Sequence, residues 1–161
     1  MICILSDTHE NVKVLKPALD LIRERNPELV IHCGDIISPP LLEHFAGLPM
    51  RFVFGNNDGE REGLRRKCKE LGFGEIDDVI EIDFKGSKIL VYHGTNPHVL
   101  QSHIDAGQHD YIFTGHTHTP RDEQIGATRV INPGALFMAA RYTFAALNIE
   151  NGDLEFVEVL K

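Results

Sequence analysis

Five short apolar runs recur along the chain, and each one stops at residues that commonly bind metals. With the polar residues that follow them, they read ICILSDTH, LVIHCGD, RFVFGNND, KILVYHG and YIFTGHTH. Continuous apolar runs of this length are typical of strands buried on both faces. In an α/β sheet such strands deliver their C-terminal loops to one edge, so we expect the polar residues to converge on one site.

Segments with helical spacing alternate with these strands. Apolar periodicity, together with prolines that begin a helix and a glycine that ends one, predicts helices over residues 11–25, 39–45, 60–71 and 99–106. Strands are predicted over residues 1–6, 29–33, 51–54, 79–84, 88–92, 110–114, 128–131, 142–149 and 154–160. The Asn151-Gly152 pair predicts a hairpin between the last two strands. The pattern favours an α/β fold with two facing sheets and helices outside.

Length and charge narrow the classes of protein and partner. A chain of 161 residues is typical of one domain, so we expect a single domain over residues 1–161. Its 24 acidic and 16 basic residues give a formal charge of −8, which argues against binding of long nucleic acids. No apolar run approaches the ~18 residues of a membrane span, so no membrane partner is expected.

The cysteines and the N-terminus suggest the compartment. The three cysteines are odd in number, and Cys3 and Cys33 lie inside apolar runs, where a small buried side chain is the common role. Disulfides are therefore not expected, and the start of the chain lacks a basic export signal. We expect a cytoplasmic protein. An edge strand or the 138–142 region could pair with a second copy, so the sequence leaves a homo-oligomer open.

The loops after the first two runs carry carboxylates. Asp7 and His9 offer an oxygen and an imidazole nitrogen, a combination that suits Mn, Fe, Co, Ni or Zn better than Ca or Mg. Alone, this pair is more simply explained as a turn and helix cap. Asp35 could likewise only close a turn. In this context it is the best candidate for a carboxylate shared by two ions, because a bridging ligand needs negative charge and two oxygens.

The remaining loops supply amides and histidines. Asn56 could offer a neutral oxygen, although the Gly-Asn-Asn-Asp stretch could equally be only a tight turn. An isolated histidine such as His93 is more often packed than ligating. His116 and His118 give the strongest local signal, because two imidazoles two residues apart after a strand are hard to explain by packing.

The order and spacing of D-x-H, G-D, G-N-x-D, H-G and G-H-x-H resemble the calcineurin-like metallophosphoesterase superfamily. Residues 132–134, which read Asn-Pro-Gly, resemble a segment of its small archaeal and bacterial phosphodiesterase branch. The resemblance implies a four-layer α/β/β/α sandwich of two mixed sheets with a dinuclear metal centre. It assigns the ligands of the first ion as Asp7, His9, Asp35 and His118, and those of the second as Asp35, Asn56, His93 and His116.

Two departures from the family pattern affect the catalytic expectations. The family usually has a histidine where this chain has Asn57, which cannot act as a general acid, a role typically worth ~10² to 10⁴ in rate. Thr95 stands where related small enzymes often continue with a second histidine. We take Asp35 and Asn57 as the catalytic residues, and Asn57 and His93 as the substrate-binding residues.

The predicted function is metal-dependent hydrolysis of a small phosphodiester by a hydroxide activated at two divalent ions. Mn or Ni are favoured as the ions, with Fe, Co or Zn also acceptable to these ligands. The alternative is a catalytically weak or inactive protein-interaction scaffold of the same fold. A metal-dependent nuclease is disfavoured by the acidic charge.

Overall fold

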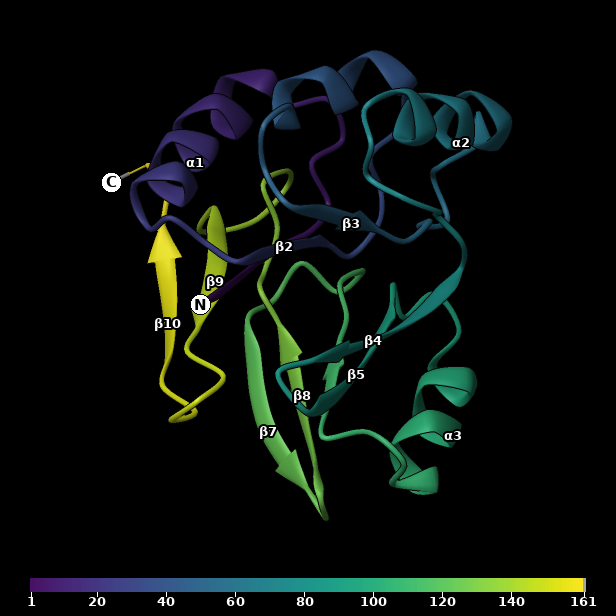
Figure 1. The fold of residues 1–161 in the computed structure, drawn as a ribbon, viewed down its shortest axis with the longest axis vertical. Helices are drawn as coiled ribbons and strands as arrows, with labels where there is room; N and C mark the ends of the chain where they lie inside the picture. The colour runs from purple at the N-terminus through teal and green to yellow at the C-terminus, as the bar shows by residue number, and fades with distance from the viewer. Residues whose placement is uncertain (161) are drawn as a thin grey trace.

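The computed structural model describes residues 1–160, which form two mixed five-stranded sheets packed face to face between helices (Figure 1). The strands of the first sheet, in spatial order, are β10 (Leu154–Glu158), β9 (Thr143–Leu147), β1 (Ile2–Leu5), β2 (Leu29–His32) and β3 (Met50–Phe52). Those of the second sheet are β4 (Val79–Phe84), β5 (Ser87–Tyr92), β6 (Tyr111–Phe113), β8 (Thr128–Asn132) and β7 (Arg121–Ile125). The expected two-sheet α/β sandwich is confirmed.

The helices form the outer layers. Three lie along the first sheet or its loops, namely α1 (Val12–Glu24), the 3₁₀ helix η1 (Pro39–Phe45) and α2 (Arg61–Glu70). The fourth, α3 (Pro97–Ala106), lies beside the second sheet, on the opposite side of the molecule (Figure 1). The segment opened by two prolines is thus a 3₁₀ helix, whereas the other three predicted helices are α-helical.

Alternation of side chains along β1 creates two of the cores. Ile2 and Ile4 point toward the second sheet, whereas Cys3 and Leu5 pack toward the helices, because successive strand side chains face opposite ways. A third, smaller core lies between the second sheet and α3 and includes Ile104. Three cores between four layers explain why the strand runs are apolar on both faces.

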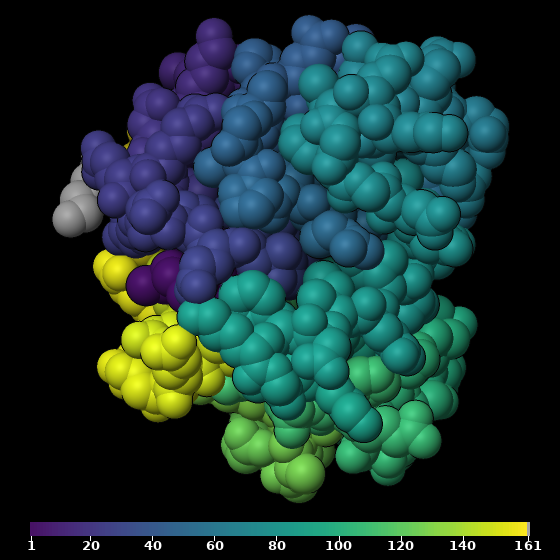
Figure 2. All heavy atoms as spheres, in the orientation of Figure 1, coloured from purple at the N-terminus to yellow at the C-terminus, as the bar shows by residue number. Residues whose placement is uncertain are grey.

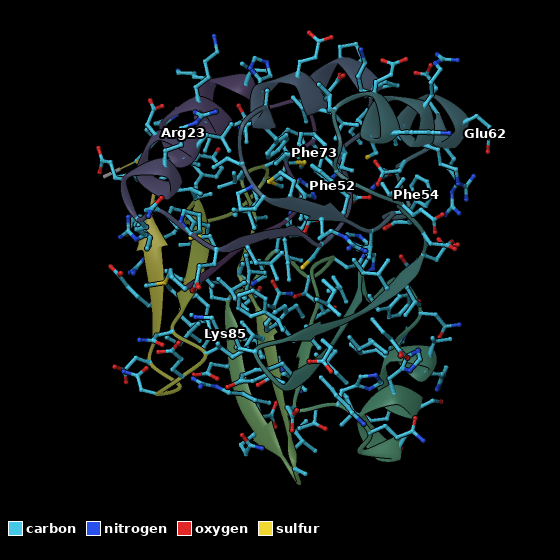
Figure 3. All side chains as sticks on the ribbon, viewed as in Figure 1. Arg23, Phe52, Phe54, Glu62, Phe73 and Lys85 are labelled. Atoms are coloured by element: carbon cyan, nitrogen blue, oxygen red, sulfur yellow. The ribbon has the colours of Figure 1, made fainter. Side chains whose placement is uncertain are left out.

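The core on the helix side of the first sheet is rich in phenylalanine. Phe52 of β3 lies with its ring centroid 5.4 Å from those of Phe45 and Phe73, and all three side chains are buried. Figure 3 shows Phe52 and Phe73 under the helical layer.

Lys85, in the β4–β5 turn of the second sheet, forms ion pairs with Glu28, which directly precedes β2, and with Glu150, in the turn between β9 and β10. It therefore links the second sheet to two segments of the first.

The predicted elements agree with the structure, with one exception. Residues 121–125 were not predicted as a strand, yet they form β7, which pairs antiparallel with β8. The segment reads Arg-Asp-Glu-Gln-Ile, and three of its five side chains are exposed, so it lacks the apolar signal of a buried strand. As an edge strand it is held by main-chain pairing with β8 and needs no apolar face of its own.

The space-filling view shows the N-terminal half, purple through blue to the teal of α2, closely packed against the second-sheet residues below it, teal to green (Figure 2). Within residues 1–160, no helix combines the length and the apolar character that crossing a bilayer requires.

Candidate metal centre

The parallel strands bring the predicted ligands to one edge of the sandwich. In the first sheet β1, β2 and β3 run parallel, and in the second β5 runs parallel to β6. A predicted ligand directly follows β5, and in the other four strands it comes two to four residues after the last strand residue. The structure brings all seven together: Asp7, His9, Asp35, Asn56, His93, His116 and His118.

Asp7 lies at the centre of the first group. Its Oδ1 atom is 3.1 Å from Nε2 of His118 and 4.0 Å from Nε2 of His9. Asp7 is completely buried, whereas the two histidines remain partly exposed. Its other oxygen, Oδ2, accepts a hydrogen bond of 3.1 Å from the backbone N–H of His116, which fixes the orientation of the carboxylate.

The second group is centred on His93. Its Nε2 atom is 3.1 Å from Oδ1 of Asn56, 3.5 Å from Oδ2 of Asp35 and 3.9 Å from Oδ1 of Asp7. Nδ1 of His116 lies 3.1 Å from the same Asn56 oxygen. Asp35 and Asp7 both approach ligand atoms of the two groups, so either carboxylate is placed to be shared between two ions.

Backbone carbonyls set the tautomers of two of these histidines. Nδ1 of His93 is 2.6 Å from the carbonyl oxygen of Cys33, and Nδ1 of His118 is 3.3 Å from that of Met138. A carbonyl only accepts, so Nδ1 carries the proton in both rings and Nε2 of the neutral ring presents a lone pair. This is the ring orientation that imidazole ligands of metal ions usually adopt.

In the neutral rings of His93 and His118, the Nε2 lone pair therefore faces neighbouring carboxylate oxygens. The lone pair of His118 meets the Asp7 carboxylate oxygen, and neither that oxygen nor Nε2 of His9 has a hydrogen-bond partner within residues 1–160. His9 Nε2 is 3.1 Å from Oδ2 of Asp35, but the two atoms are not aligned for a hydrogen bond. Buried electron-pair donors that converge without partners are costly unless a cation lies among them. The residues present fit divalent metal ions.

Asn57 holds Asp35 in place. Its backbone N–H donates to Oδ1 of Asp35 at 2.9 Å, and its side-chain amide donates to Oδ2 at 2.8 Å. Burial acts to raise the pKa of Asp35, but the nearby His93 ring and the two hydrogen bonds from Asn57 outweigh it and lower the pKa below its usual range. Asp35 is thus an anion ready to bind a cation.

The carboxylate of Asp58, which ends the Gly-Asn-Asn-Asp stretch, ties two ligand loops together. It accepts four backbone hydrogen bonds, from Asp35 and Gly55 through Oδ2 and from Ile36 and Ile37 through Oδ1, at 2.7–3.0 Å. Burial is the largest influence on its pKa and raises it, while these donors counteract the shift in part. Asp58 is a positioning residue, and its place in the motif was the only sequence signal for that role.

His32 performs a similar task between the first two loops. Its Nδ1 accepts from the backbone N–H of Gly34 at 3.1 Å, so Nε2 carries the proton that bonds Oγ1 of Thr8, also at 3.1 Å. The Thr8 hydroxyl then donates to the carbonyl of Asp35 at 3.3 Å. The ring is completely buried, and burial lowers its pKa to about 3, so it stays neutral.

Five of the seven ligands have left-handed backbone angles. The φ values are 53° for Asp7, 41° for His9, 61° for Asp35, 68° for His116 and 57° for His118. Residues other than glycine rarely adopt these angles, and clusters of them are typical of functional sites. The sharp backbone turn after each strand is what directs these side chains back over the sheet edge.

Two glycines make room for the carboxylates. A Cβ atom at Gly55 would lie 2.1 Å from Oδ1 of Asp35, and one at Gly115 would lie 2.8 Å from Oδ2 of Asp7. No side chain can occupy either position without displacing a ligand. The glycines in the G-N and G-H motifs are therefore part of the site.

Sequence reasoning missed the contacts that Leu136 and Phe137, in the loop after β8, make with the ligand loops. The backbone N–H of Leu136 lies 3.3 Å from the carbonyls of both Ser6 and Asp7, and the Asn11 side chain donates to the Leu136 carbonyl at 2.8 Å. The ring of Phe137 stacks on His9 with centroids 4.7 Å apart. None of these contacts has a local sequence signal, because apolar side chains and main-chain atoms make them.

Other histidines lie outside the centre or do not reach it. His98 lies in the first turn of α3, and His44 and His103 lie in the last turns of η1 and α3. His109 is buried and lies 3.4 Å from Glu81.

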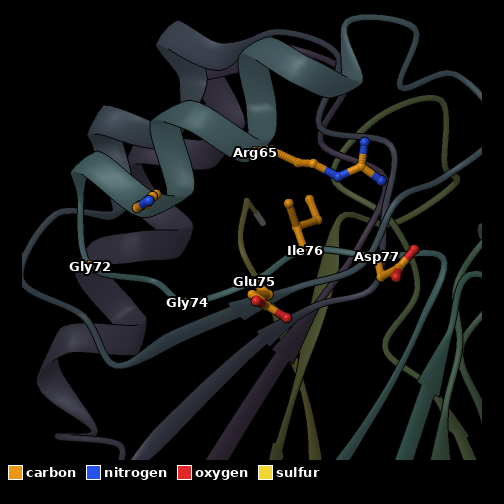
Figure 4. A pocket seen from close by; sticks show the side chains of 7 residues that line it. Arg65, Gly72, Gly74, Glu75, Ile76 and Asp77 are labelled. Atoms are coloured by element: carbon orange, nitrogen blue, oxygen red, sulfur yellow. The ribbon is translucent and has the colours of Figure 1, made fainter.

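A separate hollow lies beside α2, lined by Arg65, Lys69, Gly72, Gly74, Glu75, Ile76 and Asp77 (Figure 4). Its lining within the described part of the chain includes none of the seven predicted ligands.

Comparisons with known proteins agree with this geometry. The family model of the calcineurin-like phosphoesterase superfamily domain matches residues 1–152. Phosphodiesterase MJ0936 of Methanocaldococcus jannaschii is 36% identical over 134 residues, which cover 81% of each chain. A solved archaeal phosphodiesterase has a TM-score of 0.92 and 31% identity, with 98% of both chains covered.

More distant structures share the fold. Zinc-complexed Vps29 from Entamoeba histolytica has a TM-score of 0.62 at 16% identity, with 99% of both chains covered. That likeness concerns the fold alone. Together with the motif order and the converging ligands, the matches to the phosphodiesterases confirm the resemblance noted in the sequence, and the chain belongs to the calcineurin-like phosphoesterase superfamily.

Proposed function

We propose that the protein is a metal-dependent phosphodiesterase that binds two divalent ions, with Mn or Ni favoured, and hydrolyses a small phosphodiester. The observation that carries the proposal is the convergence of carboxylate oxygens and imidazole nitrogens, above all Oδ1 of Asp7 and Nε2 of His118 at 3.1 Å. The relative named phosphodiesterase, at 36% identity, supports the reaction class. Bound ions would activate water for attack on phosphorus and neutralise charge that develops on the phosphoryl oxygens.

The side chains would divide the work as follows. Asp7, His9, Asp35 and His118 would hold the first ion, and Asp35, Asn56, His93 and His116 the second. Asp7 could be shared by the two ions as well. Two sets of three residues could each hold an ion, Asp7 with His9 and His118 and Asp7 with Asp35 and His93, and Asp7 belongs to both. Asn57 would keep Asp35 oriented through its two hydrogen bonds.

Asn57 also affects how the leaving oxygen gains its proton. The water oxygen bonds to phosphorus as the bond to the leaving oxygen breaks, and that oxygen must gain a proton. Asn57 cannot titrate, so solvent would supply the proton, and diesters with stable leaving groups would react faster. Asn57 would also be the substrate contact nearest to the ions, whereas His93 is completely buried and is better placed to bind an ion than a substrate.

The three cysteines are consistent with a cytoplasmic role. Cys3, Cys33 and Cys68 are all buried and unpaired. Burial raises the pKa of Cys3 to about 11 and that of Cys68 to about 12, so these thiols are unreactive packing groups. We propose a cytoplasmic location because three free thiols and no disulfide are typical of proteins in reducing compartments.

The test is hydrolysis of bis(p-nitrophenyl) phosphate by metal-stripped protein, with and without added Mn or Ni. We expect turnover only with metal, and a loss of roughly 10³-fold in kcat/KM for Asp35→Ala. Asp83→Ala, which removes an exposed carboxylate on β4, is the matched control and should keep full activity. A folded protein without metal-dependent turnover would favour the scaffold alternative, and an Asp35→Ala variant as active as the parent would refute the site.

A further inference from the structure

An open groove of about 540 Å³ begins at the metal centre and runs toward β10. His118 lines it, so one wall of the groove is a predicted metal ligand. Its other lining residues include Thr117, Pro120, Met138, Arg141, Phe156 and Glu158. A substrate whose phosphorus lay at the ions would therefore have this groove beside it.

The exposed surface of the groove is apolar for a site so close to charged ligands. Met138 is 76% exposed and Phe156 is 36% exposed, and both rank among the few large apolar side chains that residues 1–160 leave open to solvent. A flexible thioether beside an aromatic ring and a proline makes a surface that suits flat apolar groups. Contact between apolar surface and water is unfavourable, so a substrate group that covers this surface would bind more tightly.

The charges of the groove restrict what could occupy it. Arg141 and Glu158 carry opposite charges and both line the groove. Their charges are opposite, so the groove's own side chains add no net attraction for a polyanion such as a nucleic acid strand. An uncharged aromatic or alkyl group suits it better.

The main chain fixes Met138 relative to the ions. Its φ is 44°, a left-handed angle, and its carbonyl oxygen lies 3.3 Å from Nδ1 of His118. The preceding residue, Phe137, stacks on His9. Contacts to two histidines of the centre thus fix the main chain at Met138, whose side chain is exposed.

We propose that this groove binds an uncharged aromatic or alkyl substituent of the phosphodiester, with Met138 as its main contact. The inference rests on the proposed function, because it assumes that the phosphorus lies at the ions. It adds a substrate class to that function: diesters with at least one bulky apolar group.

The probes are diphenyl phosphate and dimethyl phosphate, two unactivated diesters that differ only in their substituents. Both are added to metal-loaded, full-length protein as inhibitors of bis(p-nitrophenyl) phosphate hydrolysis. Diphenyl phosphate should inhibit at a lower concentration. Met138→Ser should raise its inhibition constant about tenfold, the scale of a lost apolar contact, and leave that of dimethyl phosphate unchanged.

Val99→Ser is the matched control, since Val99 is 38% exposed on α3 and does not line the groove. This variant should change neither inhibition constant. An equal effect of Met138→Ser on both inhibitors would overturn the proposal.

A second readout does not need turnover. In protein with ¹³C-labelled methionine methyl groups, diphenyl phosphate should shift the Met138 signal through its ring current, while buried Met50 provides a reference. If no inhibitor shifts Met138, the groove proposal is wrong. If Met138 shifts but no substrate is hydrolysed with any metal, the proposed function fails and the groove stands as a binding site.

The competing occupant is a second copy of the chain. Sedimentation of the parent and of Met138→Ser distinguishes it. A dimer that dissociates on substitution would show that the groove is an interface and would overturn the proposal, whereas unchanged sedimentation is expected.

Discussion

Asn57 and Asp35 are joined by two hydrogen bonds, one from the Asn57 backbone N–H at 2.9 Å and one from its side-chain amide at 2.8 Å. Both oxygens of the carboxylate are thereby fixed, so Asp35 approaches His9 and His93 in one orientation. Asn57 therefore orients the predicted ligand Asp35, although the family usually has a histidine at this position.

Asn57→Ala should weaken metal binding. The substitution removes the bond to Oδ2 but keeps the backbone bond, so the carboxylate can rotate away from the ions. A loss of about 10- to 100-fold in Mn affinity is expected, as for other residues that orient a ligand. Titration calorimetry on metal-stripped protein measures it. Gln101→Ala removes an amide bonded to a carboxylate on α3 and should leave the affinity unchanged, whereas an unaffected Asn57→Ala variant would contradict this role.

Asn57→His should alter the preference among leaving groups. An imidazole can supply the proton that the asparagine cannot, and that proton matters most when the leaving oxygen is strongly basic. We expect a gain in kcat for phenyl or alkyl esters relative to p-nitrophenyl esters, obtained from a plot of log kcat against leaving-group pKa. The slope should become shallower. Parallel lines for the two proteins would show that position 57 plays no part in proton transfer.

Gly55→Ala should disrupt the centre without unfolding the protein. The new Cβ would lie 2.1 Å from Oδ1 and 2.4 Å from the backbone N of Asp35, so both the carboxylate and the main chain of this ligand would have to shift. Metal-dependent turnover should fall at least about 100-fold, because misplacement of reacting groups by ~1 Å has effects of this size. Gly59→Ala, where a Cβ meets nothing within 4 Å, is the control in the same loop. Equal activity of the two variants would argue against the close approach.

The buried His32 should make the metal-free protein sensitive to acid. Burial lowers its folded pKa from 6.5 to about 3, so below pH 6.5 the unfolded chain takes up a proton that the folded chain does not. The free energy of unfolding should therefore fall as pH drops from 6.5 toward 3, by about 2–3 kcal/mol at pH 4.5 from this residue alone.

Urea unfolding at pH 7 and pH 4.5 measures this loss, and His32→Gln provides the comparison. The variant should be less stable at pH 7, because it loses the ring packed against Phe52, but its stability should depend less on pH. An identical pH dependence in both proteins would show that His32 does not carry the effect.

Much of the architecture could be predicted because apolar runs and helical periodicity are local signals. The strands that hold the ligands are buried on both faces, so their patterns are strong. β7 was missed because its polar side chains face solvent and its pairing with β8 supplies the stabilisation. A strand that is stabilised by main-chain hydrogen bonds to its neighbour needs no apolar pattern, so its sequence does not predict it.

The ligands could be proposed from sequence because each follows a recognisable strand, and their convergence is visible in the structure. The contacts that orient them could not. The bond from His93 to the Cys33 carbonyl, and the contact between His118 and the Met138 carbonyl, involve acceptors that every residue possesses. Only the folded chain determines which carbonyl lies beside which ring.

The left-handed turns at Asp7, His9, Asp35, His116 and His118 have a consequence for engineering. Each such angle costs an ordinary residue about 1–2 kcal/mol that glycine would not incur. Glycine at any of these five places would relieve that backbone strain but remove a candidate ligand. Attempts to raise the melting temperature should therefore leave these five positions alone and begin elsewhere in the fold.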